Sequence, residues 1–115
     1  MRLDEILDHC LKKKGVEETF PFDLNTLVLK VFGKMFLLTD IENPVSLNLK
    51  CDPEKAIELR EKYDSVLPGY HMNKQHWNTV MLNGTFSRAE LFEWIDHSYE
   101  LVFNSLPKKI REQAS

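Results

Sequence analysis

Three closely spaced β-rich segments in the first half of the chain constrain its fold most. The first two, residues 27–32 and 35–39, are separated by Gly33 and Lys34, which predicts a tight hairpin. The third, residues 45–51, alternates apolar and polar side chains at every position, as a strand with one buried face does. These segments predict an antiparallel sheet with one face buried and the other exposed to water.

Helix signals flank these strands, and a further strand is expected between the second and third helices. Apolar spacing or a capping pattern marks each helical stretch. The expected helices are residues 2–14, ended by Gly15; residues 53–63, begun by Asp52 and Pro53; and residues 88–104, begun by Ser87 and Glu90. A strand is expected at residues 77–82, and a short terminal turn begins at Pro107.

The order of these elements is helix, three or four strands, helix, one or two strands, and helix. Because the strands are grouped instead of alternating with helices, this order predicts an α+β fold. We expect a two-layer sandwich in which helices pack on one face of an antiparallel sheet. At 115 residues the chain is expected to form one domain, residues 1–115.

The composition limits the classes of function. Hydrophobic residues make up 43% of the chain and charged residues 29%, as in a folded globular domain. The formal net charge is −3, so nucleic-acid binding has to come from a local basic patch. Acidic residues near the N-terminus argue against a signal peptide, and no apolar run approaches the ~18 residues of a membrane span. We therefore expect a cytoplasmic protein with no membrane contact.

No pattern of catalytic or metal-binding residues stands out. Cys10 and Cys51 fall on apolar positions of their elements, so both are expected to be buried and reduced. His71 and His76 have no carboxylate near them in sequence, and the four scattered glycines form no phosphate-binding loop. We therefore expect no metal, no cofactor and no enzymatic activity.

Residues 65–89 contain no Asp or Glu, although the chain has 18 acidic residues. This window combines Lys74 and Arg88 with imidazole, amide and aromatic side chains, which together can bind an anionic or planar ligand. The alternative is a loop whose polar groups are used in local hydrogen bonds. The residues alone leave both interpretations open.

The middle of this window resembles the signature of a known family. Residues 68–77 read PGYHMNKQHW, which matches the P-x-x-H-M-N-K-x-H-W segment of the MmcQ/YjbR family of small bacterial proteins. Three further segments are similar to that family: residues 3–22, the hairpin at residues 31–36, and the strand that enters DPEKA at Asp52. The resemblance spans essentially the whole chain.

The resemblance implies a fold similar to the frataxin-like and secretion-chaperone-like α/β sandwiches. It also implies DNA binding, through likeness to a double-wing arrangement in which a sheet face and its hairpin meet the duplex. The polar and aromatic positions that match the family pattern are His71, Asn73, Lys74, His76, Trp77 and Asn78.

Chemistry assigns expected roles to several of these side chains. Lys74 and Arg88 would contact phosphate, and Asn73 and Asn78 would read base edges or bind the DNA backbone. Trp77 would either stack on a base or fill the core, and the core is favoured. Lys30, Lys34 and Lys50 would add positive charge if the exposed sheet face lies beside this segment.

Three hypotheses compete. The protein is a DNA-binding module that uses the sheet face and residues 71–78, or a protein-interaction or chaperone-like adaptor, or a small-ligand binder that uses His71 and His76 in a concave pocket. The expected partner is accordingly double-stranded DNA or another protein. A basic face free of acids favours DNA, whereas Asp40 or Glu42 within that face favours the adaptor.

Overall fold

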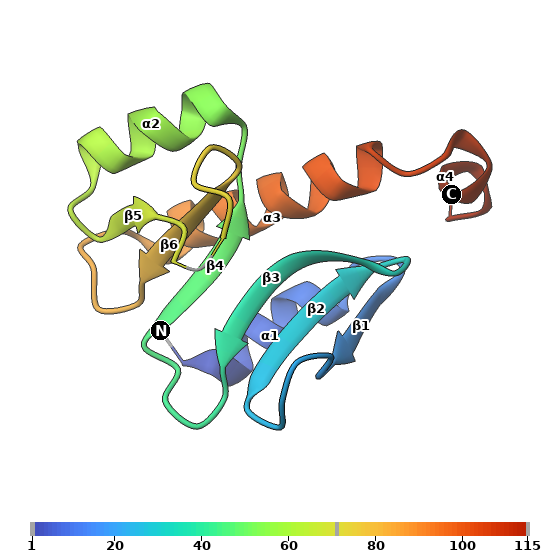
Figure 1. The fold of residues 1–115 in the computed structure, drawn as a ribbon, viewed down its shortest axis with the longest axis horizontal. Helices are drawn as coiled ribbons and strands as arrows, with labels where there is room; N and C mark the ends of the chain where they lie inside the picture. Colours follow the sequence, from blue (N-terminus) through green and yellow to red (C-terminus); the bar gives the residue numbers. More distant parts are fainter. Residues whose placement is uncertain (1, 71, 115) are drawn as a thin grey trace.

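Six strands form one antiparallel sheet in the computed structural model, which describes residues 2–70 and 72–114 (Figure 1). The spatial order is β1-β2-β3-β4-β6-β5, and every neighbouring pair is antiparallel. The strands are β1 Val16–Thr19, β2 Thr26–Val31, β3 Lys34–Asp40, β4 Ser46–Lys50, β5 Val66–Pro68 and β6 Trp77–Met81. The grouped strands of the sequence therefore build a single sheet.

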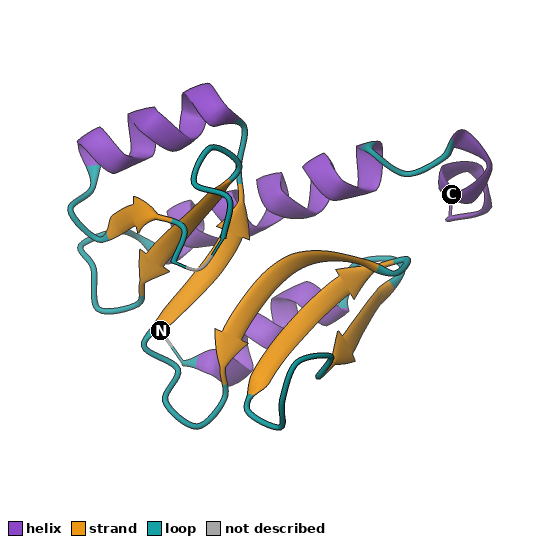
Figure 2. Cartoon of the chain, viewed as in Figure 1, coloured by secondary structure: helices purple, strands orange, loops and turns teal. Residues whose placement is uncertain are grey.

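The helices are α1 Leu3–Leu11, α2 Pro53–Lys62, α3 Arg88–Asn104 and α4 Lys108–Ala114. In the view of Figure 1, α1 and α3 lie behind the strands, and α4 projects beyond the end of α3. Figure 2 shows the strands as one layer and α2 above the short strands β5 and β6. The predicted α+β sandwich is confirmed. None of the described helices is long and apolar enough to cross a membrane.

Two of the predicted helix starts are built by side-chain caps. The carboxylate of Asp52 accepts hydrogen bonds from two backbone N–H groups in the first turn of α2, and Pro53 follows it. Ser87 and Glu90 form a complete capping box at the start of α3, because each side chain accepts from the other residue's backbone N–H. These local signals therefore placed both helix starts correctly.

Two reversals of the chain meet at Phe32. α1 ends at Leu11, three residues earlier than predicted, and Gly15 leads into β1 with φ 76°. The β2–β3 turn lies on Phe32 and Gly33, one residue earlier than predicted, with φ values of 47° and 87°. Two consecutive positive φ values suit a tight two-residue hairpin. The backbone N–H of Phe32 donates to the carbonyl of Gly15 at 3.0 Å, which ties the two reversals together.

The main core lies between the sheet and the helices. β3 supplies two consecutive fully buried residues, Phe36 and Leu37, because a register shift against β2 leaves Phe36 without a paired residue. Cys10 packs in this core, and Cys51 is also buried. The predicted burial of both cysteines is therefore confirmed. The two thiols are also free, as expected, and are not bonded to each other.

The second face of the sheet is less exposed than the alternation of apolar and polar residues predicts. Val28, Leu38 and Trp77 form a separate buried cluster there, and Met35 and Met72 pack against it. Met72 belongs to the connection between β5 and β6, which crosses this face. Trp77 is only 8% exposed, so its predicted core role is confirmed, although the core it fills is the smaller one.

Candidate functional site

The connection between β5 and β6, residues 69–76, carries the family-like signature and is held by its own hydrogen bonds. The backbone N–H of Gly69 donates to the carbonyl of Trp77 at 2.9 Å, and that of Trp77 donates to the carbonyl of Asn73 at 3.0 Å. The Nζ of Lys74 donates to the carbonyl of Gly69 at 3.0 Å. The ammonium group of Lys74, which was expected to contact phosphate, therefore bonds within the β5–β6 connection and stabilises it.

The other polar side chains of this segment also have structural roles or lie elsewhere. The Oδ1 of Asn73 accepts from the backbone N–H groups of Gln75 and His76, as in a local turn motif. The side chain of His76 is exposed. His71 lies outside the described residues. The interpretation as a loop with locally satisfied polar groups fits Asn73 and Lys74.

Asn78 does not face the surface that was expected to meet DNA. It is 2% exposed and lies on the helix side of β6, where its Oδ1 accepts from Nε of Arg60 at 2.7 Å. Its Nδ2 donates to the carbonyl of Ala56 at 3.5 Å. Asn78 therefore fastens α2 to the sheet, and its amide is not available to read a base edge.

The cations expected to share one face are distributed over two. Arg88 begins α3 in the helix layer, where it pairs with Glu5 of α1 at 3.3 Å. Lys30 and Lys50 alternate with residues that point into the main core, so they lie on the face without helices. The expected acid-free basic face is therefore not formed by these residues.

Acidic residues interrupt the helix-free face. Glu17 of β1 is the cross-strand neighbour of Lys30, and Asp40 of β3 is the cross-strand neighbour of Thr26. Both acids lie on the face that carries Lys30, because side chains directly opposite each other in a sheet share a face. A broad duplex contact on this face is disfavoured.

Cations occur instead on three segments that lie toward the same end of the molecule: the β2–β3 turn, the segment after α1, and α4 (Figure 1). The hydroxyl of Tyr99 donates to the carbonyl of Lys14 at 2.6 Å. The rings of Phe32 and Phe103 lie 6.4 Å apart, and Phe103 precedes the connection to α4. We call these three segments the basic end; their cations are Lys12, Lys14, Lys34, Lys108, Lys109 and Arg111.

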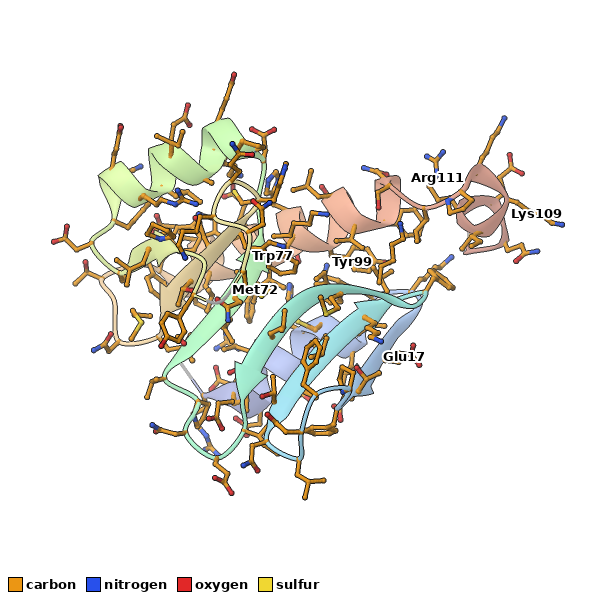
Figure 3. All side chains as sticks on the ribbon, viewed as in Figure 1. Glu17, Met72, Trp77, Tyr99, Lys109 and Arg111 are labelled. Carbon is orange, nitrogen blue, oxygen red and sulfur yellow. The ribbon has the colours of Figure 1, made fainter. Side chains whose placement is uncertain are left out.

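Most cations of the basic end are unpaired. Within residues 2–70 and 72–114, Lys108 alone among the six has an ion-pair partner, Glu112 at 3.8 Å, and both side chains are largely exposed. Lys13, which is not part of the basic end, is neutralised by Asp96 at 2.7 Å. Lys109 and Arg111 lie at this end of the molecule in Figure 3, whereas Glu17 lies lower on the sheet.

The opposite end of the long axis is mixed in charge. α2 contains the acids Glu54, Glu58 and Glu61 together with three cations, Lys55, Arg60 and Lys62. The flanking residues Asp52 and Asp64 add two further acids. This end therefore offers a polyanion no surplus of positive charge.

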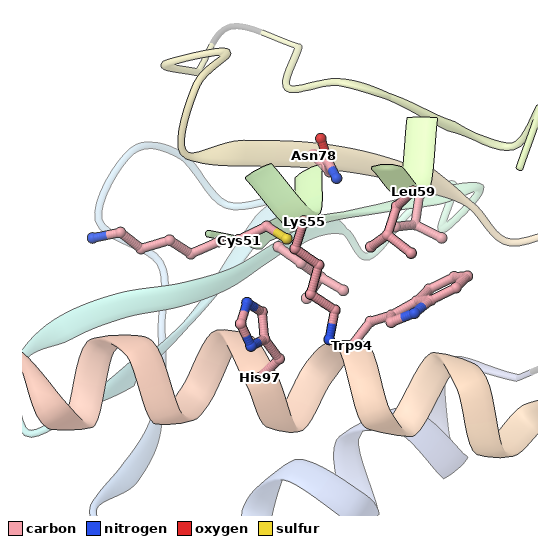
Figure 4. A pocket seen from close by; sticks show the side chains of 9 residues that line it. Cys51, Lys55, Leu59, Asn78, Trp94 and His97 are labelled. Carbon is pink, nitrogen blue, oxygen red and sulfur yellow. The ribbon is translucent and has the colours of Figure 1, made fainter. Parts of the chain in front are cut away.

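The thiols and small cavities provide no evidence for catalysis. Burial raises the pKa of Cys10 to about 12 and that of Cys51 to about 11, so both thiols are protonated near neutral pH. Cys51 and His97 line a small cavity between α2, α3 and the sheet (Figure 4). Its volume of about 10 Å³ has room for no more than one water molecule. Among the described residues, no group of three or more His, Cys, Asp or Glu side chains is arranged to hold a metal ion.

Sequence reasoning identified one member of the basic end, Lys34, and missed the other five. Local signals for them were present, because lysines follow the first helix at residues 12–14 and cations cluster at residues 108–111. Neither cluster indicates which other segment lies beside it. The contacts of Phe32 with Gly15 and Phe103 supply that information.

A six-stranded antiparallel sheet with helices on one face and a long connection across the other defines a two-layer α+β sandwich protein. A model of the YjbR family matches residues 11–101, and the chain belongs to this family. The YjbR protein of Escherichia coli (strain K12) is 34% identical, across 97% of this chain and 96% of that protein. The YyaQ protein of Bacillus subtilis (strain 168) is 44% identical, across 86% of this chain and 96% of that protein.

A solved structure agrees with the fold described above. The crystal structure of Deinococcus radiodurans protein DR2400, which contains a DUF419 domain, has a TM-score of 0.91 against this chain at 43% sequence identity. The match covers 97% of this chain and 86% of that one. The family and the fold are therefore established together.

Proposed function

We propose that this protein is a non-enzymatic double-stranded DNA-binding protein and that the basic end makes the contact. The observation that carries the proposal is that three separate chain segments at one end of the molecule bear six cations, five of them without an ion-pair partner among the described residues. The β2–β3 turn, with Lys34 at its end, is the part of the sheet that meets the duplex. α2, at the far end, has equal numbers of acids and cations and makes no contact with the phosphates.

The chemistry of the basic end supports phosphate contacts more than base reading. Lysine ammonium groups act as point charges on flexible stems, so they bind phosphates without sequence preference. The amides expected to read bases, Asn73 and Asn78, are engaged in the β5–β6 connection and at α2. We therefore expect weak binding that depends little on sequence and strongly on salt.

The salt dependence of duplex binding tests this proposal. In titrations of a fluorescently labelled duplex, four to six phosphate contacts give a slope of log affinity against log salt of about −3.6 to −5.4. Lys34→Ala and Lys109→Ala should each flatten the slope by about one unit. Lys74→Ala and Lys62→Ala are the matched controls, because each removes one lysine outside the basic end, and both should keep the wild-type slope.

Two results would overturn the proposal. One is the absence of duplex binding by the wild-type protein at low salt. The other is a wild-type slope in both Lys34→Ala and Lys109→Ala. A slope that flattens only in Lys74→Ala would indicate that the β5–β6 connection, and not the basic end, contacts the DNA.

A protein-interaction role is the second candidate. The β1–β2 connection exposes three large apolar side chains, Phe20, Phe22 and Leu24, at 45%, 63% and 88%. Clustered apolar exposure of this kind is typical of protein interfaces. An adaptor that uses this connection would show no duplex binding at low salt, and binding to its protein partner would change little with salt.

A further inference from the structure

The helix-free face holds a cavity of about 470 Å³ between the β1–β2 connection and the β5–β6 connection. Two aromatic side chains, Phe22 and Tyr70, stand at its walls, and Leu38 and Met72 provide apolar lining. This volume falls in the range of small-molecule sites, which are apolar with a few polar groups. We propose that this cavity binds a small planar apolar molecule that carries a cationic group.

The walls account for the planar, apolar body of the ligand. Phe22 and Tyr70 both line the cavity and remain 63% and 69% exposed. Aromatic faces pack best against flat, polarisable groups in stacked or edge-on geometry. Met72, which is partly buried, adds an adaptable thioether beside them.

The backbone at both walls is anchored to the protein. The backbone N–H of Tyr70 donates to Oγ1 of Thr79 at 2.9 Å, and that hydroxyl donates to Oδ1 of Asn48 at 2.5 Å. Next to Phe22, Asp23 accepts from the backbone N–H groups of Asn25 and Thr26. One wall is thus anchored to β4 and β6, and the other to a capped turn, while β2, β3 and β4 contribute lining residues.

Polar groups at the cavity account for the charge of the ligand. Asp40 is the one charged side chain among the described residues that line it, and no Lys or Arg is among them. The Oδ1 of Asp40 accepts from the backbone N–H groups of Glu42 and Asn43, and Oδ2 has no such partner within the described chain. Asn48 also lines the cavity, and its Nδ2 has no hydrogen-bond partner in the same part of the chain. A carboxylate without a nearby cation favours an ammonium group and disfavours phosphate.

This site is separate from the basic end. None of the six cations of the basic end lines the cavity, and its single carboxylate repels the anions that the basic end attracts. The ligand proposal and the DNA proposal therefore succeed or fail independently.

Three indole derivatives test the inference, because they share a planar body and differ in charge. Tryptamine is cationic, indole is neutral and indole-3-acetate is anionic at neutral pH. Amide chemical shifts of the ¹⁵N-labelled protein should move at Tyr70, Asn48 and Leu38, with a tryptamine dissociation constant of about 1 mM. Tryptamine should bind about fivefold more tightly than indole-3-acetate at low salt, since one exposed carboxylate discriminates by roughly that factor.

Two variants and one control localise the binding. Asp40→Asn keeps the oxygen that caps its turn and removes the charge, so it should erase the preference for tryptamine and leave indole binding unchanged. Phe22→Ala removes an exposed ring from one wall and should weaken all three probes at least about fivefold. Ile57→Ala removes an exposed apolar side chain of α2, outside the cavity, and should change nothing.

Three outcomes would overturn the inference. The first is the absence of shifts around the cavity with any probe at about ten times the expected dissociation constant. The second is equal affinity for tryptamine and indole-3-acetate in the wild type. The third is unchanged binding in Phe22→Ala.

Discussion

The hydroxyl of Ser98, in the middle of α3, donates a 2.5 Å hydrogen bond to the carbonyl of Phe36, the unpaired residue of β3. The same oxygen accepts from the backbone N–H of Lys50 at 2.9 Å. Ser98 is fully buried. One side chain therefore satisfies a donor on β4 and an acceptor on β3, and joins the helix layer to both strands.

Ser98→Ala should lower the free energy of unfolding by about 1–3 kcal/mol, because it leaves a partly buried N–H and a buried carbonyl without their partner. Urea denaturation followed by far-UV circular dichroism measures the change. Ser105→Ala is the matched control, since its hydroxyl bonds only to the carbonyl of Val102 at the exposed end of α3. Equal losses in the two variants would contradict the bridging role of Ser98.

Trp77→Ala should cost about 3–5 kcal/mol of folding free energy, because the ring is 8% exposed and packs with Val28 and Leu38. Tyr70→Ala, seven residues earlier and 69% exposed, should cost no more than about 0.5 kcal/mol. Urea midpoints of both variants provide the comparison. A small cost for Trp77→Ala would mean that the cluster on the helix-free face contributes little to folding.

Gly15→Ala and Gly33→Ala should differ in cost, although both glycines have positive φ values. A Cβ at Gly33 would meet nothing within 4 Å, so about 1–2 kcal/mol of backbone strain is expected. A Cβ at Gly15 would come within 2.3 Å of the Phe32 ring, which adds about 1–3 kcal/mol of overpacking. Thermal or urea unfolding of the pair measures the difference. Equal stabilities would show that the Phe32 ring moves aside without cost.

Acidification below about pH 6.5 should destabilise the protein through His97. Burial lowers the pKa of His97 from its ordinary value of 6.5, with a further contribution from Lys55. Its Nε2 accepts from the backbone N–H of Asp52 at 3.2 Å, which requires the neutral ring. The unfolded chain then takes up a proton more readily than the folded one. The contribution of His97 is therefore complete above pH 6.5 and declines as pH falls towards the lowered pKa.

His97→Gln tests this pH dependence, because glutamine keeps an acceptor for Asp52 and does not titrate. The loss of stability between about pH 7.5 and about pH 5.5, measured by urea denaturation, should shrink in this variant. His76→Gln, at an exposed position, should retain the wild-type pH dependence. A wild-type pH dependence in His97→Gln would exclude His97 as the titrating group.

Local sequence signals predicted most elements but not all of their bounds. Asp52 with Pro53, and Ser87 with Glu90, marked helix starts that the structure reproduces, because a cap acts within one turn. The hairpin was predicted one residue late. The glycine at position 33 led to the prediction that Gly33 and Lys34 are the two turn residues. In the structure the turn residues are Phe32 and Gly33, and Phe32 has a positive φ and contacts Gly15 and Phe103. Those contacts join residues far apart in sequence.

The site residues were predicted less well than the fold. Residues 65–89 were correctly singled out as acid-free, but a deficit of acids does not show whether a lysine is available. Lys74 bonds to Gly69, and Arg88 pairs with Glu5. Their partners are a backbone carbonyl within the loop and an acid on another helix, and the composition of the window reveals neither.

The sequence by itself determined the family, the element types and the helix caps, because these depend on residues within a few positions of one another. Only the tertiary structure decided that the segment after α1, the β2–β3 turn and α4 lie toward one end, and that Phe22 and Tyr70 stand at the walls of one cavity. Such convergence depends on strand register and on packing between distant segments. Register is set by burial across the whole sheet, and periodicity within one strand does not specify it.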